Sequence, residues 1–437
     1  MHREASIPAP APDSADAEPR QADPRQPDLL QPLAPAQRID VLDVVRGFAL
    51  LGILLMNIEF FTRPMQGIVF GLDPTMAGAD YVAGWLVMAF VQGKFWTLFS
   101  LLFGMGFAVM LERAQAAGGR FAGIYARRLL VLLLIGLAHT LLLWPGDILV
   151  PYALAGFAML LLFRRTPVPR LWKWGLAFYA VRLLLMWMMV GGIAMVQFDP
   201  TAAEEANRAM AQGTAMMRAD YAAAEPVYAS GSWSEVVAQR WRDAQMQWSW
   251  FPMMLPSILG VFLLGAWFMR SGVMRDAGAH RPLFRRLVLV GLPLGALLAV
   301  VAMPLLVGTE LTVPTSRLAM GTMLMGIASL LLCLGYLAAV VLATLGPAPW
   351  LRAWLAPVGR MALSNYLLQS AFFTTLFYGY GFGLWGEVPR AWQILLAVAF
   401  FAVQVLLSRW WMQRFRYGPM EWLWRALTYL SLPPVRA

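Results

Sequence analysis

Residues 38–57 read RIDVLDVVRGFALLGILLMN, a short polar entry followed by an almost unbroken apolar run. Asp40, Asp43 and Arg46 are spaced at i, i+3 and i+6, so a helix places all three on one face. Ionised side chains are costly where a helix enters lipid, and those that stay there pair with one another or serve a site inside the bundle. The stretch therefore predicts a membrane-spanning helix and marks where a polar interior begins.

The composition of the whole chain is typical of a membrane protein. Of its 437 residues, 60% are hydrophobic and 13% are charged, whereas soluble domains are about 25% charged. The 19 Trp suit aromatic belts at the membrane interface. The net charge of +10 comes largely from arginines in short loops between apolar runs, so it indicates topology and no nucleic-acid partner. The single cysteine, Cys333, argues against disulfides and a thiolate metal cluster, and we predict no metal site.

We predict an all-α polytopic membrane protein with about ten transmembrane helices. Residues 1–37 hold eight prolines without apolar periodicity, and we interpret them as a disordered tail that is not a signal peptide. Residues 413–437 suit the cytoplasmic interface and include a short helix with Glu421 in its first turn. Residues 38–412 hold apolar spans of roughly the 20 residues that cross a bilayer, at 45–62, 92–111, 128–144, 148–164, 172–197, 251–269, 286–307, 318–344, 360–378 and 391–412.

Arginine placement predicts the orientation of the spans. Loops at residues 113–128, 164–173 and 270–286 are crowded with arginine, and with ten spans they fall on one side together with both termini. Arginine-rich loops stay in the cytoplasm, so both termini are predicted to be cytoplasmic. The longest remaining loop, about residues 198–250, is richer in acids, and we predict it to be external and partly helical. The lipid bilayer is the partner that the composition requires.

His139 is the only histidine within an apolar span. A tight turn follows it at residues 144–147, and Tyr152 lies equally far beyond the turn, so a helix hairpin brings both to one depth, about 10 Å below the turn. Asp147 is expected to cap the second helix or to reach toward His139. The sequence thus predicts one layer of polar side chains near the external ends of the spans, called the outer layer: Asn57, Glu59, Lys94, His139, Asp147 and Tyr152.

These residue types suit acid–base chemistry. A histidine beside a carboxylate can act as a general base, and Asn57 or Lys94 can stabilise an oxyanion. The simpler interpretation is that His139 is a structural hydrogen bonder. We expect Ser364, Asn365 and Gln369 to hydrogen-bond between helices. The sequence contains no P-loop, dinucleotide-binding fingerprint, zinc-protease helix or nucleophile elbow.

Four stretches together carry a resemblance to a known family: residues 38–57, 93–104, 359–366 and 417–425. From about residue 37 to its end, the chain resembles the YeiB-like family of bacterial inner-membrane proteins, classified as domain of unknown function 418. The hairpin between His139 and Tyr152 also fits that family's pattern. The resemblance implies a multi-pass protein of the bacterial inner membrane and carries no established activity.

A more distant resemblance rests on the pattern Arg-x-Asp-x-x-Asp-x-x-Arg-Gly at residues 38–47. This stretch is similar to the corresponding part of the transmembrane acyltransferases, which include heparan glucosaminide N-acetyltransferase and the sugar O-acyltransferases. That resemblance implies a helix bundle that moves an acyl group from cytoplasmic acyl-CoA to an acceptor across the membrane, with a membrane-embedded histidine. The chain departs from the sugar O-acyltransferase pattern, because no histidine follows Arg46-Gly47 and Asn57 stands near the expected polar position.

The leading hypothesis is therefore an integral membrane acyltransferase with its catalytic residues in the outer layer. His139 would be the general base or the acyl carrier, and Asp147 would orient it. Asn57 or Lys94 would stabilise the developing negative charge, with Tyr152 in the same layer.

The donor and acceptor follow from the same hypothesis. Asp43 and Arg46 would organise a cytoplasmic mouth, where Arg46 or Arg360 would meet a phosphate of acyl-CoA. The acceptor would be a glycan or lipid of the cell envelope. Two alternatives stay open: a transporter of a small or amphipathic solute, in which the buried charges bind substrate or protons, and a non-catalytic membrane partner protein.

Overall fold

The computed structural model describes residues 40–73, 75–116, 118, 121–310, 313 and 315–436, and the tail predicted at residues 1–37 lies outside them. The described residues form helices without a β-sheet. In chain order these are α1 (Asp40–Asn57), η2 (Ile58–Phe61), η3 (Met65–Phe70), α2 (Gly78–Phe90), α3 (Lys94–Ala116), α4 (Phe121–Ala138), η4 (His139–Leu143), α5 (Leu149–Ala158), η5 (Met159–Phe163), α6 (Val168–Val196), α7 (Pro200–Ser230), α8 (Trp233–Arg270), α9 (Arg281–Arg286), η6 (Leu287–Gly291), α10 (Leu292–Leu306), α11 (Ser316–Leu345), α12 (Trp350–Arg360), α13 (Ala362–Phe377), α14 (Arg390–Met412) and α15 (Pro419–Tyr429).

The protein is an all-α polytopic membrane protein, as predicted. Within the described ranges, 8 helical segments are long and apolar enough to cross a membrane. Each predicted span falls on a helix, and two of these helices are short. The segment Leu149–Phe163 is a shorter apolar helix, and α13 has 16 residues with several polar side chains.

Helices α2 and α12 were not predicted. The apolar stretch Gly78–Ala116 has 39 residues, about twice the length needed to cross a bilayer. The chain divides it after α2, where Gly93 has a φ of 85°, a conformation that residues with a side chain rarely adopt. Helix α2 then packs against α10 and α14, while α3 packs against α1, α8 and α11.

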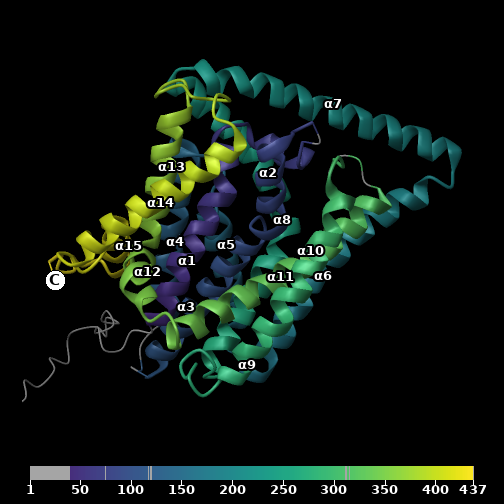
Figure 1. The fold of residues 1–437 in the computed structure, drawn as a ribbon. Helices are drawn as coiled ribbons and strands as arrows, with labels where there is room; N and C mark the ends of the chain where they lie inside the picture. Colours follow the sequence, from purple (N-terminus) through teal and green to yellow (C-terminus); the bar gives the residue numbers. More distant parts are fainter. Residues whose placement is uncertain are drawn as a thin grey trace, which may run out of the picture.

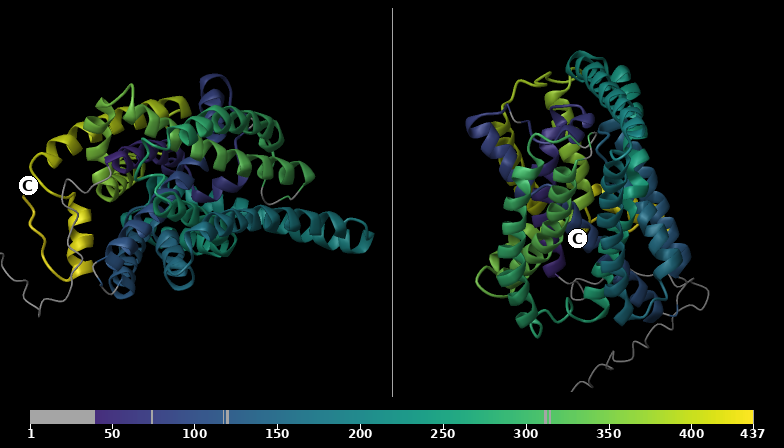
Figure 2. Two further views of the ribbon diagram at one scale, coloured as in Figure 1. Left: turned by 90° about the horizontal axis from the view of Figure 1, so that it is seen from below. Right: turned by 90° about the vertical axis from the view of Figure 1, so that its right-hand side faces the viewer.

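The helices form one bundle, and α7 lies across one end of it (Figure 1). Helix α7 runs from the outer end of α6 back over the bundle, while α9 marks the opposite end. The views in Figure 2 show the projection of this arm beyond the other helices. Burial distinguishes the central helices from the peripheral ones. In the first span, which contains α1, 72% of the most apolar 18-residue stretch is buried, whereas in α6 only 11% of the corresponding stretch is buried. The exposed apolar side chains of α6 would face lipid.

Two glycines let α1 and α12 cross in backbone contact. A Cβ atom on Gly47 would lie 2.3 Å from the carbonyl oxygen of Leu355, and one on Gly359 would lie 1.8 Å from that of Asp43. No side chain tolerates such distances, so the crossing requires glycine at both positions. It joins two of the stretches singled out in the sequence, residues 38–57 and 359–366.

A third stretch, residues 417–425, closes the start of α13. The carboxylate of Glu421 accepts hydrogen bonds from the backbone N–H groups of Leu363 (2.7 Å) and Ser364 (3.1 Å) and from the Ser364 hydroxyl (2.5 Å). The first amides of a helix have no partner within it, so Glu421 caps α13 from a distant part of the sequence. Burial raises the pKa of the Glu421 carboxyl. The helix around Glu421 was predicted, but its capping role was not.

The predicted loop at residues 198–250 consists mostly of helix. Asp199 caps the start of α7, and a capping box of Ser232 and Glu235 starts α8. Helix α8 then runs for 38 residues through Pro252 and Pro256. The boundary expected near residue 250 lies inside this helix, because α8 is about 57 Å long at 1.5 Å per residue and extends well beyond a bilayer core.

Candidate functional site

Three side chains from separate elements form a continuous hydrogen-bonded chain inside the bundle. The Nδ1 atom of His139 lies 2.8 Å from Oδ1 of Asp147, and its Nε2 atom lies 2.8 Å from the hydroxyl of Ser370. Their exposed fractions are 2%, 9% and 1% for His139, Asp147 and Ser370. In this arrangement an imidazole can take the serine proton while the carboxylate fixes its tautomer. We call these three residues the relay.

The local sequence explains how His139 and Asp147 meet. Helix α4 ends in the π turn η4, and Pro145 follows shortly after, where it cannot continue a helix. A Cβ on Gly146 would lie 2.2 Å from the ring of Trp144, so the turn admits only glycine there. Oδ2 of Asp147 accepts a hydrogen bond from the Val150 amide at 2.7 Å, which leaves Oδ1 for the histidine. Asp147 thus has both roles that the sequence offered as alternatives.

Sequence reasoning missed Ser370, which lies on α13, far from the other two residues in the chain. Two hydrogen bonds to α14 fix the orientation of α13 about its own axis. Asn365 donates to Ser408 at 2.9 Å, and Gln369 donates to Gln404 at 2.9 Å. These interhelical bonds confirm the expectation for Asn365 and Gln369. The polar run at positions 364, 365, 369 and 370 was the available signal, because it marks the faces of α13 that meet other helices.

An aromatic layer covers the relay, formed by Phe61, Trp144 and Phe373. The ring centroids of Trp144 and His139 are 6.4 Å apart, those of Phe61 and Trp144 are 4.4 Å apart, and those of Phe61 and Phe373 are 5.6 Å apart. The indole N–H of Trp144 donates to the carbonyl of Phe60 at 3.1 Å. This layer excludes water from one side of the relay, which strengthens electrostatic interactions there.

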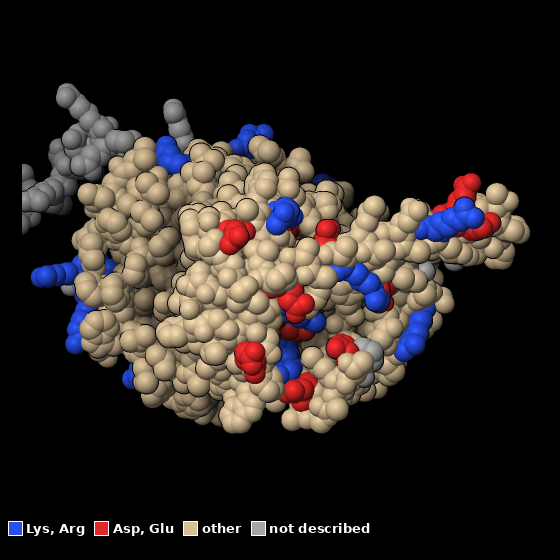
Figure 3. Space-filling view, turned by 90° about the horizontal axis from the view of Figure 1, so that it is seen from above, with Lys and Arg blue, Asp and Glu red and all other residues tan. Residues whose placement is uncertain are grey.

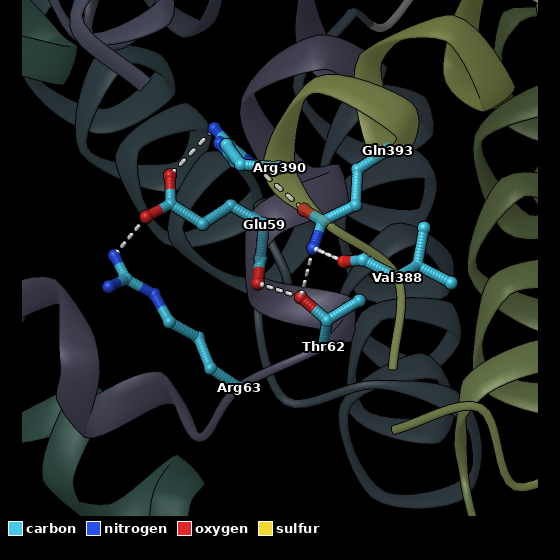
Figure 4. Close-up of polar contacts among 6 residues, drawn as sticks. All are labelled: Glu59, Thr62, Arg63, Val388, Arg390 and Gln393. Carbon is cyan, nitrogen blue, oxygen red and sulfur yellow. Dashed lines mark hydrogen bonds and ion pairs between the residues drawn. The ribbon is translucent and has the colours of Figure 1, made fainter. Parts of the chain in front are cut away.

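An ion-pair cluster begins two residues before Phe61 and consists of Glu59, Arg63 and Arg390. Figure 4 shows the Glu59 carboxylate between the two guanidinium groups, with Arg390 at 2.8 Å and Arg63 paired on the other oxygen. Arg390 also donates to the side chain of Gln393 at 3.1 Å. The sequence placed Glu59 in the outer layer but missed both arginines. The signal for Arg390 was its position directly before a long apolar run.

Neither Tyr152 nor Asn57 hydrogen-bonds to the relay in the described part of the chain. The Tyr152 hydroxyl donates to the carbonyl of Trp96 at 2.7 Å and lies 2.8 Å from the Ser100 hydroxyl, so it fastens α5 to α3. Asn57 is buried at the end of α1. It lies four residues before Phe61, so the two are expected to share a face of this continuous helical segment.

Lys94 is placed apart from the relay. Its ammonium group donates to the carbonyl of Met88 at 3.1 Å and lies 3.0 Å from the sulfur of Met325, and the residue is 0% exposed. No carboxylate from the described part of the chain hydrogen-bonds to it. The sequence predicted how deep in the membrane Lys94 lies. The direction in which its side chain points depends on the turn at Gly93 between α2 and α3.

Two buried charged residues of α8, Arg240 and Asp243, contact other parts of the bundle, and Arg240 contacts the turn that holds the relay histidine. Arg240 donates to the carbonyl of Leu142, in η4, at 2.8 Å. Asp243 accepts hydrogen bonds from Gln66 at 2.8 Å and Tyr228 at 2.5 Å. Both Arg240 and Asp243 are 0% exposed. Sequence reasoning assigned them to the external loop, because their burial depends on contacts with distant residues such as Leu142 and Gln66.

Figure 3 looks onto the end that α7 covers. This face is mostly uncharged, with basic and acidic side chains side by side near its middle and on the projecting arm. The exposed pair of Arg208 and Glu204 lies near the start of α7. Among the residues that the structure describes, no group of three or more His, Cys, Asp or Glu is arranged to hold a metal ion.

The predicted cytoplasmic mouth lies at the opposite end of α1 from Asn57. Arg46 and Asp43 form an ion pair one helical turn apart, and the backbone of Gly359 touches that of Asp43. Arg360 is therefore next in sequence to the crossing point of α1 and α12. The mouth and the relay are separate in the bundle, because Arg46 and Asn57 are about 16 Å apart along α1 at 1.5 Å per residue.

Comparison with known proteins identifies the family. The family described as "Protein of unknown function (DUF418)" matches residues 268–431. "Uncharacterized protein YxaH" of Bacillus subtilis is 36% identical over 93% of this chain and 98% of its own. "Uncharacterized protein YeiB" of Escherichia coli is 31% identical over 91% of this chain and 98% of its own. No solved structure matches significantly. The chain belongs to the YeiB-like (DUF418) family of membrane proteins.

Proposed function

We propose that this protein is a membrane-embedded acyltransferase and that the relay carries the acyl group. The observation that carries the proposal is the hydrogen-bonded order Asp147, His139, Ser370, with both links at 2.8 Å in a buried site. In water a serine hydroxyl is a weak nucleophile, and an oriented histidine beside it is the usual means of activation. A purely structural His139 would use the same two bonds only to satisfy its ring nitrogens, so the acyl-transfer rates of the relay variants separate the two roles.

The proposed reaction has two steps. The Ser370 oxygen attacks the carbonyl carbon of an acyl thioester, its proton passes to Nε2 of His139, and the thiolate leaves with that proton. An acceptor hydroxyl then attacks the acyl-serine, gives its proton to His139, and Ser370 recovers the proton as the ester transfers. Asp147 holds the Nδ1 proton and stabilises the imidazolium in both steps. Asn57, which is buried at the end of α1 four residues before Phe61, is the proposed stabiliser of the oxyanion.

The donor is proposed to be acyl-CoA entering at the mouth of Asp43 and Arg46. Arg46 is partly exposed there, which suits a phosphate of the nucleotide. The acyl-bearing arm would then span the distance along α1 to the relay. The acceptor is proposed to be a glycan or lipid of the cell envelope that enters from the end covered by α7.

The test uses purified protein with radiolabelled acetyl-CoA and cell-envelope lipid and glycan fractions. Ser370→Ala and His139→Ala should each reduce acyl transfer by at least about 10,000-fold. Ser257→Ala is the matched control, because this buried serine donates only to the Met254 carbonyl within its own helix. Rapid quenching followed by peptide mass analysis should find the acyl group on Ser370. Unchanged transfer in both relay variants would refute the proposal.

A transporter is the second candidate, and Lys94 is the observation that favours it. Its hydrogen bonds reach only a carbonyl and a thioether. A buried lysine within the membrane is energetically costly, so it indicates a functional site by itself. Solute counterflow in proteoliposomes discriminates between the two candidates. Flux without a covalent product, abolished in Lys94→Gln and kept in the exposed-face variant Lys173→Gln, would favour transport.

We also propose that the protein lies in the bacterial inner membrane with the α9 end in the cytoplasm. The support is the crowding of arginines at that end, including Arg275, Arg281 and Arg285. The native Cys333 is buried, so it stays silent in labelling experiments. A membrane-impermeant maleimide should label Arg208→Cys on α7 in intact spheroplasts and should label Arg275→Cys only after permeabilisation. The reverse pattern would invert the topology.

A further inference from the structure

A small pocket lies beside the ion-pair cluster, between the first turns after α1 and helix α2. Its volume is about 40 Å³, which admits one polar group of a larger molecule. The lining residues are Glu59, Arg63, Ile68, Gly71, Leu72, Gly84, Met88 and Gln92. The pocket has no part in the proposed acyl transfer.

The carboxylate in the pocket wall is already neutralised. Figure 4 shows Glu59 held on one oxygen by Arg390 and on the other by Arg63. Arg390 is fixed in turn by Gln393, and its side chain is only 3% exposed. Glu59 therefore has little unpaired negative charge with which to repel an anion.

The pocket presents unused hydrogen-bond donors. A guanidinium has five N–H groups, and within the described chain the only hydrogen-bonding partner of Arg63 is Glu59. The side chain of Gln92 makes no hydrogen bond to any residue in the described ranges. A ligand here would therefore be an acceptor, and a guanidinium matches the geometry of an oxyanion.

Two nearby acids, Asp73 and Asp80, hydrogen-bond to groups other than Arg63 and Gln92, although the charge of Asp73 still interacts with that of Arg63. Asp73 accepts hydrogen bonds from the amide and hydroxyl of Thr75, at 2.8 and 2.7 Å. Asp80 caps α14 by accepting from the amide of Ala391 at 2.9 Å. Arg218 of α7, which lies over the same loop, is paired with Glu310. The donors of Arg63 and Gln92 are thus the polar groups left for a ligand.

The other wall of the pocket is apolar and borders the lipid-facing surface. Ile68 at its edge is 40% exposed, and Leu72 and Met88 continue the wall. On α2, Val82 is 54% exposed and Leu86 is 46% exposed. Exposed apolar side chains on a membrane helix face acyl chains. A ligand with an oxyanion at one end and hydrocarbon at the other fits both walls.

We infer that this pocket binds the phosphate of an anionic membrane lipid, with Arg63 and Gln92 as its hydrogen-bond donors. The lipid chains lie along the exposed face of α2. The site is separate from the relay, so its occupation does not depend on the proposed acyltransferase activity.

The test measures thermal unfolding of purified, delipidated protein with three additives. Phosphatidylglycerol has the phosphate and the chains, diacylglycerol has the chains alone, and glycerol 3-phosphate has the headgroup alone. Phosphatidylglycerol well above its dissociation constant should raise the melting temperature by roughly 3 °C or more. Diacylglycerol should have no effect at the same concentration.

The variants assign the effect to the pocket. Arg63→Gln should lose most of the shift, and Gln92→Ala, which leaves the ion pairs intact, should reduce it. Arg218→Gln is the matched control on the same face and should keep the full shift. An equal shift with diacylglycerol, or an unchanged shift in both pocket variants, would overturn the inference. An equal shift with glycerol 3-phosphate alone would replace the lipid by a soluble phosphate.

Discussion

The relay and the ion-pair cluster lie close together in one half of the bundle, but their buried polar groups are stabilised by different partners. The relay joins an imidazole to one carboxylate and one hydroxyl inside an apolar shell. The ion-pair cluster holds one carboxylate between two guanidinium groups and opens onto a pocket. The aromatic layer connects the two, because Phe61 follows Glu59 closely in the chain and packs on Trp144 beside His139.

The two regions are therefore suited to different tasks, the relay to chemistry and the ion-pair cluster to binding. Guanidinium groups stay charged at any physiological pH, so the ion-pair cluster offers fixed charge and geometry. An imidazole can gain and lose a proton near neutral pH, so the relay offers proton transfer. Variants that affect one region and spare the other test this division.

The largest expected effect comes from Asp147→Asn. The amide keeps the shape of the relay but favours the wrong tautomer of His139, so acyl transfer should fall by about 10,000-fold with little change in stability. The radiolabelled transfer assay measures the rate. Asp73→Asn, outside both regions, should keep full activity. A comparable loss in both variants would mean that the relay has no special role.

The next effect concerns stability and should single out the ion-pair cluster. Glu59→Ala leaves Arg390 buried without its carboxylate, which should cost about 3–5 kcal/mol of folding free energy. Glu204→Ala removes an exposed pair on α7 and should cost less than about 1 kcal/mol. Denaturant unfolding of the purified variants measures both. Equal costs would show that burial at Glu59 has no energetic consequence.

A smaller effect tests the aromatic layer between the two regions. Trp144→Phe removes the donor to the Phe60 carbonyl and some buried volume, and should cost about 2 kcal/mol. The same change at Trp187, which is 47% exposed on α6, should alter stability by less than about 0.5 kcal/mol. Thermal unfolding compares the two, and a larger loss at Trp187 would contradict the assignment of α6 to the periphery.

The smallest effect concerns Glu421, a buried carboxyl that accepts hydrogen bonds from neutral groups, whereas Glu59 is paired with two guanidinium groups. The pKa of Glu421 is raised above its ordinary value of 4.5 by burial, so the folded protein binds this proton more tightly than the unfolded chain. The resulting stabilisation is full below the ordinary value and disappears as the pH rises through the raised pKa. The melting temperature of the wild type minus that of Glu421→Gln should therefore fall as the pH rises above about 4.5. A rising difference would reverse the sign of the shift.

The spans could be predicted because hydrophobic length is a local property. Each predicted span falls on a helix, and the His139–Asp147 contact could be foreseen because a tight turn fixes both residues within one hairpin. Helix α2 was missed, because hydropathy alone does not locate the division near Gly93 in a long apolar stretch.

The partners from distant segments could not be predicted. Ser370 reaches His139, and Arg390 reaches Glu59, across more than two hundred residues of intervening chain. Hydropathy gives the depth of a residue in the membrane but leaves open which direction it faces around its helix. That direction is set by contacts such as Gln369 with Gln404, which a single sequence does not reveal.

The glycine crossing of α1 and α12 limits how this bundle can move. Their main chains touch at Gly47 and Gly359, so neither helix can slide or tilt without displacing the other. We therefore expect the two helices to move together, so that any opening that admits a substrate is hinged at a junction where side chains and not backbones form the contact.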